Sequence, residues 1–270
     1  MTEIDRRSRG RPRDWDDKSA QNTIKSLDRA MEVLTRLSEL EGATLSALAG
    51  DLAQAPASVY RVLVTLEGRG IVQFDAGPQT WHIGPTAFLI GARFLRRTSL
   101  VERARPVLRA LMEATGETAN LGVETDGQVL FVSQVETHAS IRAFFPPGTM
   151  SPMHASGIGK ALLAQKPPQE VARIIKRHPL QGFTPHTLTT PKALGAGLQE
   201  IVAQGYAFDQ EERTVGMRCI AAPVFDVTGE AVAGLSVSGP AQRIADDQVT
   251  RLATQVMAAA RNLTRELGGA

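Results

Sequence analysis

The chain has 270 residues, of which 43% are hydrophobic, and its formal net charge is +2 at pH 7. This length is typical of two domains, and the small net charge excludes a polycation, so any affinity for nucleic acid must come from local surfaces. The single cysteine, Cys219, excludes an internal disulfide and a thiolate metal cluster. No apolar run is long enough to span a membrane and no signal peptide is recognisable, so we expect a cytoplasmic protein. We also expect neither a metal nor a cofactor.

Residues 1–22 are polar and are expected to form a disordered basic arm. Arg9 and Arg11 belong to the tetrapeptide RGRP at 9–12, which resembles the core of an AT-hook. In that motif an extended backbone enters a narrow A·T minor groove with arginines on either side. A solvated tail without specific contacts is the alternative, because the aspartates within 14–17 partly cancel the charge.

Residues 23–84 are predicted to form a winged helix-turn-helix domain. Apolar residues at helical spacing predict a supporting helix over 24–40 and two short helices after it. Thr44 or Ser46 can cap the first short helix, and Pro56 suits the first turn of the second.

Two short strands joined by a turn follow, around 71–74 and 81–83, and are predicted to form the wing. Helix, turn, helix and wing within about 40 residues favour a module that places one helix in the DNA major groove. A three-helix packing unit that touches no DNA is the alternative.

The exposed face of the second short helix carries small, hydroxyl-bearing and basic side chains, which are the types that contact phosphates and base edges. The candidate DNA-contacting residues are Ser46, Ala57, Ser58, Tyr60, Arg61 and Thr65, together with Arg9 and Arg11 of the arm.

Residues 85–99 are expected to form a linker helix, and residues 100–270 a second domain in which strands and helices are interspersed. We predict helices over 100–115, 157–164, 169–177, 191–204 and 245–267, and strands over 118–124, 129–135, 141–145, 207–211, 219–225 and 231–238. Strands in hairpins with helices between them predict an antiparallel sheet flanked by helices, so the chain is expected to be an α+β protein.

Four ordered motifs of the second domain, together with the winged helix, resemble the IclR family of bacterial transcriptional regulators. The motifs are SPMHASGIGKA at 151–161, GYAFDQEE at 205–212, GMRCIAAPVF at 216–225 and SVSGP at 236–240. The resemblance runs from about residue 23 to the C-terminus. It implies a GAF-like effector-binding domain, a homodimer or homotetramer, and binding to a palindromic operator in double-stranded DNA. The effectors of the family are usually small carboxylates or aromatic acids.

Gly157 and Gly159 also indicate an anion site, independently of the resemblance. They open a predicted helix, where free backbone N–H groups and the positive end of the helix dipole favour an anion. Tight packing of the helix is the alternative role of these glycines. Lys160 follows, but the spacing of a phosphate-binding loop is not met, so we expect no nucleotide.

The resemblance to glyoxylate- and pyruvate-responsive members implies six effector-binding residues: Gly157, Ile158, Asp209, Cys219, Ser236 and Ser238. Ser236 and Ser238 alternate on a predicted strand and should face one side of it. Asp209 beside an anion has to be protonated, or to accept a hydrogen bond from a hydrated aldehyde. Ile158 stands where glyoxylate binders commonly have alanine, and its bulk narrows the site.

A narrow site suits a two-carbon ligand, so the implied effector is glyoxylate. The resemblance then suggests a regulator of glyoxylate assimilation through the β-hydroxyaspartate cycle. Pyruvate or an aromatic acid is the alternative. The candidates for the apolar walls of the pocket are Leu121, Val123, Phe131, Met150 and Met153. Apolar residues on sheet faces more often belong to the core than to a binding site.

An enzyme with an appended DNA-binding domain is the competing functional class, with Cys219 as nucleophile and His154 as base. No local catalytic signature surrounds either residue, and no metal-ligand spacing such as HExxH occurs. A lone cysteine is more often a small apolar residue, and His154 more often a structural one. We therefore expect a regulator without catalytic residues.

Overall fold

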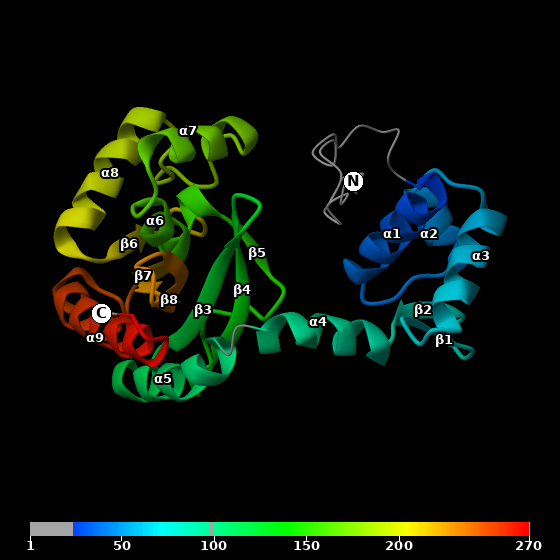
Figure 1. Ribbon diagram of the computed structural model, residues 1–270, viewed down its shortest axis with the longest axis horizontal. Coiled ribbons are helices and arrows are strands. Elements are labelled where there is room, and N and C mark those ends of the chain that lie inside the picture. The colour runs from blue at the N-terminus through cyan, green and yellow to red at the C-terminus, as the bar shows by residue number, and fades with distance from the viewer. Residues whose placement is uncertain (1–23, 98–99, 270) are drawn as a thin grey trace, which may run out of the picture. The chain divides into compact units, whose positions relative to one another are not determined.

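The computed structural model describes residues 24–97 and 100–269, and the chain divides into two compact units, 1–93 and 94–270 (Figure 1). The basic arm with Arg9 and Arg11 lies outside the described residues. Among the described helices, none combines the length and the apolarity that a membrane crossing requires.

The first unit consists of three helices and a two-stranded hairpin, in the order that the sequence predicts. Its elements are α1 (Lys25–Ser38), α2 (Leu45–Asp51), α3 (Pro56–Glu67), β1 (Val72–Asp75) and β2 (Thr80–Ile83), followed by α4 (Pro85–Arg97). Thr44 caps α2, because its side chain accepts a hydrogen bond of 3.3 Å from the backbone N–H of Ala47, and Pro56 occupies the first turn of α3. The core of this unit is formed by Val33, Leu37, Ala43, Leu48, Ala49, Val59, Leu63, Val72 and Trp81.

The second unit is built on one antiparallel sheet with the strand order β5-β4-β3-β8-β7-β6. Its strands are β3 (Thr118–Thr125), β4 (Gln128–Val135), β5 (Met150–Pro152), β6 (Ala207–Gln210), β7 (Met217–Phe225) and β8 (Ala231–Pro240). Its helices are α5 (Leu100–Thr115), α6 (Gly157–Leu163), α7 (Pro168–Arg177), α8 (Pro191–Gln204) and α9 (Asp246–Glu266), with a 3-10 turn at Met153–Ala155. The fold is therefore α+β, as expected.

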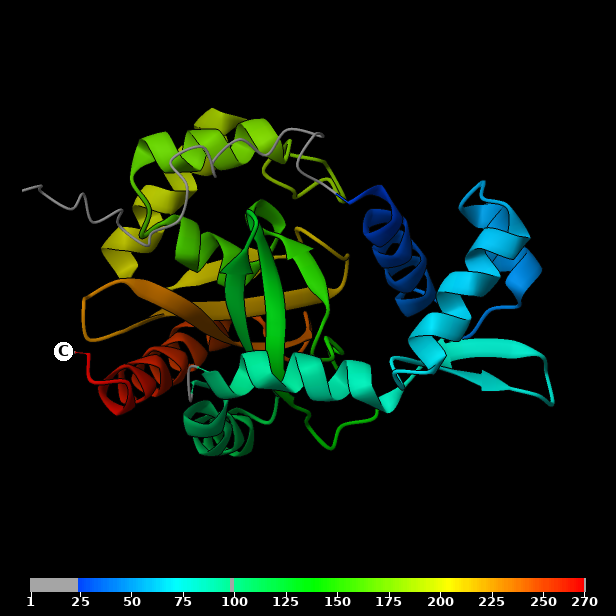
Figure 2. The ribbon, with the colours of Figure 1, turned by 45° about the vertical axis from the view of Figure 1, so that its right-hand side comes forward.

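Helices cover both faces of this sheet. Figures 1 and 2 show α5 and α9 against one face and α6, backed by α7 and α8, against the other. Side chains alternate along each strand between these two layers. Ile220 and Ala222 of β7 belong to the apolar cluster under α5 and α9, whereas Cys219 and Ala221 face the cluster around α6.

The hairpin between β3 and β4 turns at Asp126 and Gly127, as predicted. Both residues have positive φ angles, of 53° and 75°. This is the conformation of a type I′ turn, which matches the twist of the flanking strands.

The strand predicted over 141–145 is wrong. The strand that pairs with the free edge of β4 is β5, at Met150–Pro152. Ile141 and Phe144 are 71% and 62% exposed. Ala143 is buried and Phe145 stacks on Phe131, so the segment does have an inward side, but it pairs with none of the described strands. Prolines at 146–147 follow, which have no N–H to donate to a strand ladder.

Candidate functional site

Three of the predicted effector residues lie side by side across neighbouring strands. Asp209 of β6 is the register partner of Cys219 of β7, and Cys219 is in turn the partner of Ser238 of β8. Cross-strand partners in an antiparallel sheet point to the same face. Their side chains therefore form one row on the face that α6 covers.

A second polar row runs next to the first. Ser236 of β8 is the register partner of Asn120 of β3, and Asn120 is the partner of Gln134 of β4. The Nδ2 atom of Asn120 lies 3.4 Å from Oγ of Ser236 and 3.2 Å from Oγ of Ser238. The two serine hydroxyls thus face one side, as predicted. The sequence does not predict Asn120 or Gln134, because a buried amide in a strand has no characteristic spacing.

Helix α6 begins directly above the first row. Ser156 caps it by accepting a hydrogen bond of 3.3 Å from the N–H of Gly159. A Cβ atom on Gly157 would lie 2.7 Å from Sγ of Cys219, so only glycine lets the helix approach the sheet this closely. On Gly159 a Cβ would lie 2.3 Å from the carbonyl oxygen of Met153. Both glycines therefore have a packing role, whatever contact their backbone makes with a ligand.

The side chain of Ile158 packs on the sheet beside the two rows. It is buried, and it occupies the space above Gly122 and Gly234, where Cβ atoms would be 3.3 Å and 2.6 Å from its carbons. Gly234 precedes Ser236 by two residues on β8, so Ile158 closes the layer at that end of the serine pair.

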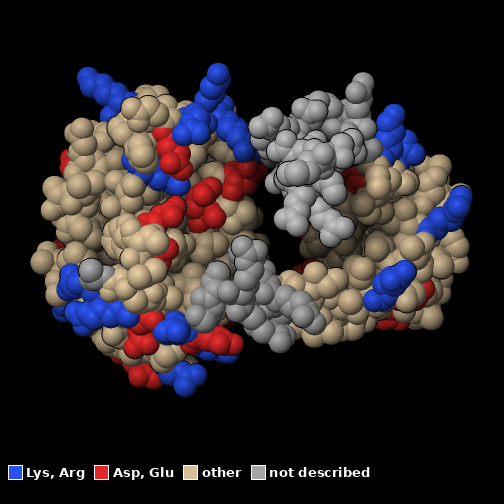
Figure 3. Space-filling model, in the orientation of Figure 1, with Lys and Arg blue, Asp and Glu red and all other residues tan. Residues whose placement is uncertain are grey.

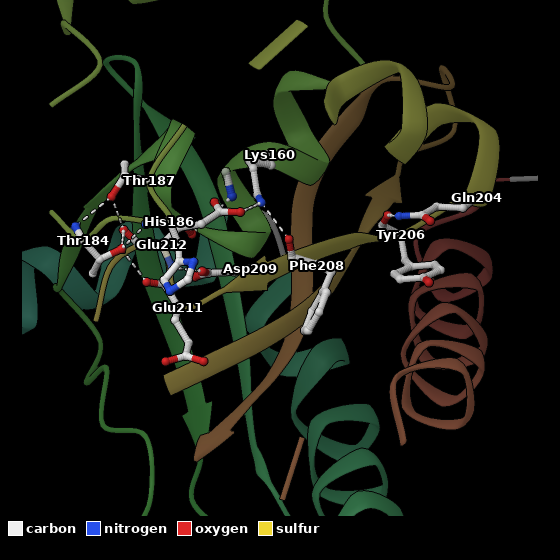
Figure 4. A network of polar contacts seen from close by, with 12 residues as sticks. Lys160, Thr184, His186, Thr187, Gln204, Tyr206, Phe208, Asp209, Glu211 and Glu212 are labelled. Carbon is white, nitrogen blue, oxygen red and sulfur yellow. Dashed lines mark hydrogen bonds and ion pairs between the residues drawn. The ribbon is translucent and has the colours of Figure 1, made fainter. Parts of the chain in front are cut away.

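A buried cluster of charged groups adjoins Asp209. Figure 4 shows Lys160 extending from α6 to the carboxylate of Glu212 and to the carbonyl oxygen of Phe208, to which its Nζ donates a hydrogen bond of 2.7 Å. Glu212 is 5% exposed and Lys160 3%. Burial raises the pKa of Glu212, against the opposing effect of Lys160.

Asp209 is 8% exposed and faces this cluster. Burial, together with the charge of Glu212, raises the pKa of Asp209 to about 7, although Lys160 acts in the opposite direction. Near neutral pH this carboxyl group therefore exists in both protonation states, and its protonated form is a hydrogen-bond donor.

The turn that follows Asp209 is held by two threonines of the loop between α7 and α8 (Figure 4). Thr187 donates a hydrogen bond of 2.6 Å to the carbonyl oxygen of Glu212, and Thr184 donates one of 2.7 Å to that of Glu211. The Thr187 hydroxyl also accepts from the backbone N–H of Thr184. These contacts fix the backbone that presents the two carboxyl groups.

The Nε2 atom of His154 does not act as a base toward Cys219. That atom donates to the carbonyl oxygen of Gln181 at 2.9 Å, since a carbonyl can only accept. Burial lowers the pKa of His154. Burial, with the nearby charge of Asp209, raises the pKa of Cys219 to about 11, so the thiol is protonated near neutral pH and is a poor nucleophile.

The candidate wall residues divide between the two faces of the sheet. Phe131 and Met153 are buried in the cluster around α6. Leu121 and Val123 lie in the cluster under α5 and α9, on the opposite face, so they do not line a site beside Ser236. Met150 is 39% exposed.

The candidate DNA-contacting residues Ser46, Ala57, Ser58, Tyr60, Arg61 and Thr65 are all exposed on the first unit. Thr65 donates a hydrogen bond of 2.7 Å to the carbonyl oxygen of Arg61, one turn earlier on α3. Tyr60 packs edge-on against Trp81 of the wing, with ring centroids 6.5 Å apart. On the face that Figure 3 shows, Lys and Arg side chains project from this unit at separate points, so local contacts rather than a continuous basic surface are available there.

Family models match both units of the chain. One describes the IclR helix-turn-helix domain and matches residues 26–76, and the other describes the IclR C-terminal region of bacterial transcriptional regulators and matches residues 92–265. The chain belongs to the IclR family. The HTH-type transcriptional regulator BhcR of Paracoccus denitrificans is 55% identical over 241 residues, which cover 89% of this chain and 86% of that protein. The acetate operon repressor of Salmonella typhimurium is 37% identical over 249 residues, which cover 91% of each protein.

The crystal structure of Thermotoga maritima IclR is similar with a TM-score of 0.76 and 28% identity, covering 91% of this chain and all of that one. This IclR-family chain therefore has an N-terminal helix-turn-helix unit and a C-terminal effector-binding unit, and its relatives regulate transcription.

Proposed function

We propose that this protein is a transcriptional regulator whose second unit binds a small oxo-carboxylate, with glyoxylate as the first candidate. The observation that carries the proposal is the row formed by Asp209, Cys219 and Ser238, with Ser236 beside it, under the first turn of α6. This row supports the proposal because it combines hydroxyl donors with a carboxyl group whose pKa of about 7 lets it carry a proton.

Each group of the row has a part in the proposed binding. The hydroxyls of Ser236 and Ser238 donate to the carboxylate of the acid, and the protonated carboxyl of Asp209 donates to the ligand or accepts from its hydrated aldehyde. The backbone N–H groups at Gly157 and Ile158 add donors from the helix side. The thiol of Cys219 fills the centre of the row as a small neutral group.

A small acid fits the proposal better than an aromatic one. Ile158 and the close approach of Gly157 to Cys219 leave little room above the strands. The Salmonella relative is named for an acetate operon, which supports a ligand of two-carbon metabolism. We extend the proposal to a regulator of glyoxylate assimilation through the β-hydroxyaspartate cycle; pyruvate is the alternative effector.

The first unit is proposed to bind a palindromic operator as part of a homodimer or homotetramer in the bacterial cytoplasm. Ala57, Ser58 and Arg61 of α3 face the major groove in this arrangement. Apolar side chains exposed near one another on two helices support self-association, because contiguous exposed apolar surface often marks an interface. They are Ile24, Leu27 and Met31 at α1 and Phe88, Leu89 and Ile90 on α4.

The effector is proposed to act by changing the separation of the two DNA-binding units of a dimer. The DNA repeat fixes the spacing of the half-sites, so a small change in that separation costs affinity. Helix α4, which joins the two units of the chain, is the proposed transmitter.

Calorimetric titration of the full chain tests the effector assignment. We expect saturable binding of glyoxylate, weaker binding of pyruvate and none of glycolate or benzoate. Asp209→Ala and Ser238→Ala should abolish the binding. Ser133→Ala is the matched control, because Ser133 is a buried serine of the same sheet whose register partner, Leu121, belongs to the opposite layer. Binding of benzoate but not glyoxylate would overturn the choice of effector.

Operator binding is tested at one fixed salt concentration, since the ionic strength alone changes DNA affinity strongly. A palindromic site is selected from random DNA, and its affinity is measured with and without a saturating effector. Equal affinities would contradict regulation by the effector.

A further inference from the structure

Asn120 occupies the point where the two serines of the proposed site meet. It is fully buried in β3, and its Nδ2 atom lies between Oγ of Ser236 and Oγ of Ser238, at 3.4 Å and 3.2 Å. Its Oδ1 atom accepts a hydrogen bond of 3.0 Å from Nε2 of Gln134 on the next strand.

The surroundings determine which way the Asn120 amide points. The carbonyl oxygen of Thr118 lies 3.5 Å from Nδ2 of Asn120. A carbonyl oxygen can only accept, so the amide nitrogen belongs on that side and the amide oxygen toward Gln134. Three oxygens therefore surround the Asn120 nitrogen, which has two hydrogens to share among them, and its orientation has a defined consequence for the serines.

An amide nitrogen can only donate, so neither serine hydroxyl can donate its proton to it. A hydroxyl that accepts from Asn120 retains its own proton for another partner. We propose that Asn120 is a positioning residue that turns the protons of Ser236 and Ser238 away from β3 and makes them available to the carboxylate of the effector. This inference rests on the proposed function, because it assigns a donor role to hydroxyls of that same site.

The same geometry determines the class of ligand that the serines favour. If the residue at 120 accepted, both hydroxyls would donate to it and would offer only lone pairs to the ligand. The site would then favour a neutral molecule with hydroxyl donors. With an amide nitrogen there, the serines offer protons and favour an anion, so Asn120 contributes to the selection of carboxylates over alcohols.

The test replaces the donor by an isosteric acceptor in the full-length protein. In Asn120→Asp the carboxylate attracts the serine protons and repels the anion, so affinity for glyoxylate and pyruvate at pH 8 should fall roughly 100-fold. In Asn120→Ala the hydroxyls are free to rotate, and the loss should be about 10-fold or less. Ser133→Ala should bind like the wild type.

A neutral variant separates positioning from charge repulsion. Asn120→Leu keeps the branched shape of the side chain, adds no charge and offers the serines neither a donor nor an acceptor, so a positioning role predicts a loss of affinity for glyoxylate of about 10-fold. Affinity of Asn120→Leu equal to that of the wild type would show that Asn120 only packs and would overturn the inference.

A second readout needs no ligand. Cys219 is the only cysteine of the chain, and hydrogen bonds from Ser236 and Ser238 lower the pKa of its thiol against the larger effect of burial. Iodoacetamide alkylation at fixed pH therefore reports where the serine protons point. The rate should fall from wild type to Asn120→Leu, which adds no charge beside the thiol, and equal rates would overturn the inference. If the wild type bound neither acid, the proposed effector would fail while the alkylation series would still decide the role of Asn120.

Discussion

The carboxyl groups of Asp209 and Glu212 are joined within one turn, where Oδ1 of Asp209 accepts a hydrogen bond of 2.9 Å from the backbone N–H of Glu212. Lys160 pairs with Glu212 in the same buried place. One ammonium group thus faces two carboxyl groups, and because all three groups are buried, water does not screen their charges. An anionic ligand would bring a third negative charge, which the protein can accommodate by holding Asp209 protonated.

Effector affinity should therefore depend on pH. If only the protonated form of Asp209 binds the anion, the apparent Kd rises as that form becomes scarce above its pKa of about 7. From pH 6 to pH 8.5 the apparent Kd for glyoxylate should rise roughly 30-fold. Calorimetry over this range measures it, with Asp209→Asn as the control, whose profile should be flat. A flat wild-type profile would contradict proton-linked binding.

Lys160 is expected to be important for stability. Lys160→Met leaves Glu212 buried without its cation, which should cost about 3–5 kcal/mol of unfolding free energy. The double variant Lys160→Met/Glu212→Gln removes both charges and should recover most of that loss. Urea denaturation at pH 8 gives both values. A double variant as unstable as the single one would show that the charge pair is not the cause.

The glycines of α6 should respond differently to alanine. Gly157→Ala places a Cβ 2.7 Å from Sγ of Cys219 and should cost about 1–3 kcal/mol of stability. Adding Cys219→Ala removes the sulfur and should restore much of it. Gly159→Ala would place its Cβ against the backbone of Met153, which no side-chain substitution can remove, so no such rescue is expected. Thermal unfolding of Gly157→Ala, Cys219→Ala, their double variant and Gly159→Ala checks this, and additive losses at positions 157 and 219 would refute the contact.

Arg61 is expected to contribute to operator binding. Its side chain is exposed on α3, and Arg61→Ala should weaken binding to the selected operator roughly 10- to 100-fold without a change in thermal stability. Arg36→Ala is the matched control, since the Arg36 guanidinium is held by Asp51 at the end of α2 and by Glu39, which follows α1. Equal effects of both substitutions would indicate that only overall charge matters.

Local signals explain what the sequence predicts well. The cap at Thr44, the proline at the start of α3 and the turn at Asp126 and Gly127 are each set by the chemistry of one or two residues. Such signals act over a few positions, so they can be recognised without knowledge of the tertiary fold.

The buried polar network could not be predicted in the same way. Asn120, Gln134 and Glu212 acquire their roles only when strands and loops distant in sequence become neighbours. The segment at 141–145 fails for a different reason. Its alternation is real, since Ala143 is buried and Phe145 stacks on Phe131, but its backbone pairs with none of the described strands. A pattern reports which side chains share a face, and the tertiary fold decides whether the backbone finds a strand to pair with.

The two faces of strand β3 contact different layers of the fold. Asn120 lies among the serines, whereas Ala119 and Leu121, immediately before and after it, are buried under α5. Packed interiors are nearly incompressible, so β3 cannot shift on one side without shifting on the other. Only the thickness of strand β3 therefore separates the proposed effector site from α5. A displacement of Asn120 is passed directly to α5, without an intervening loop.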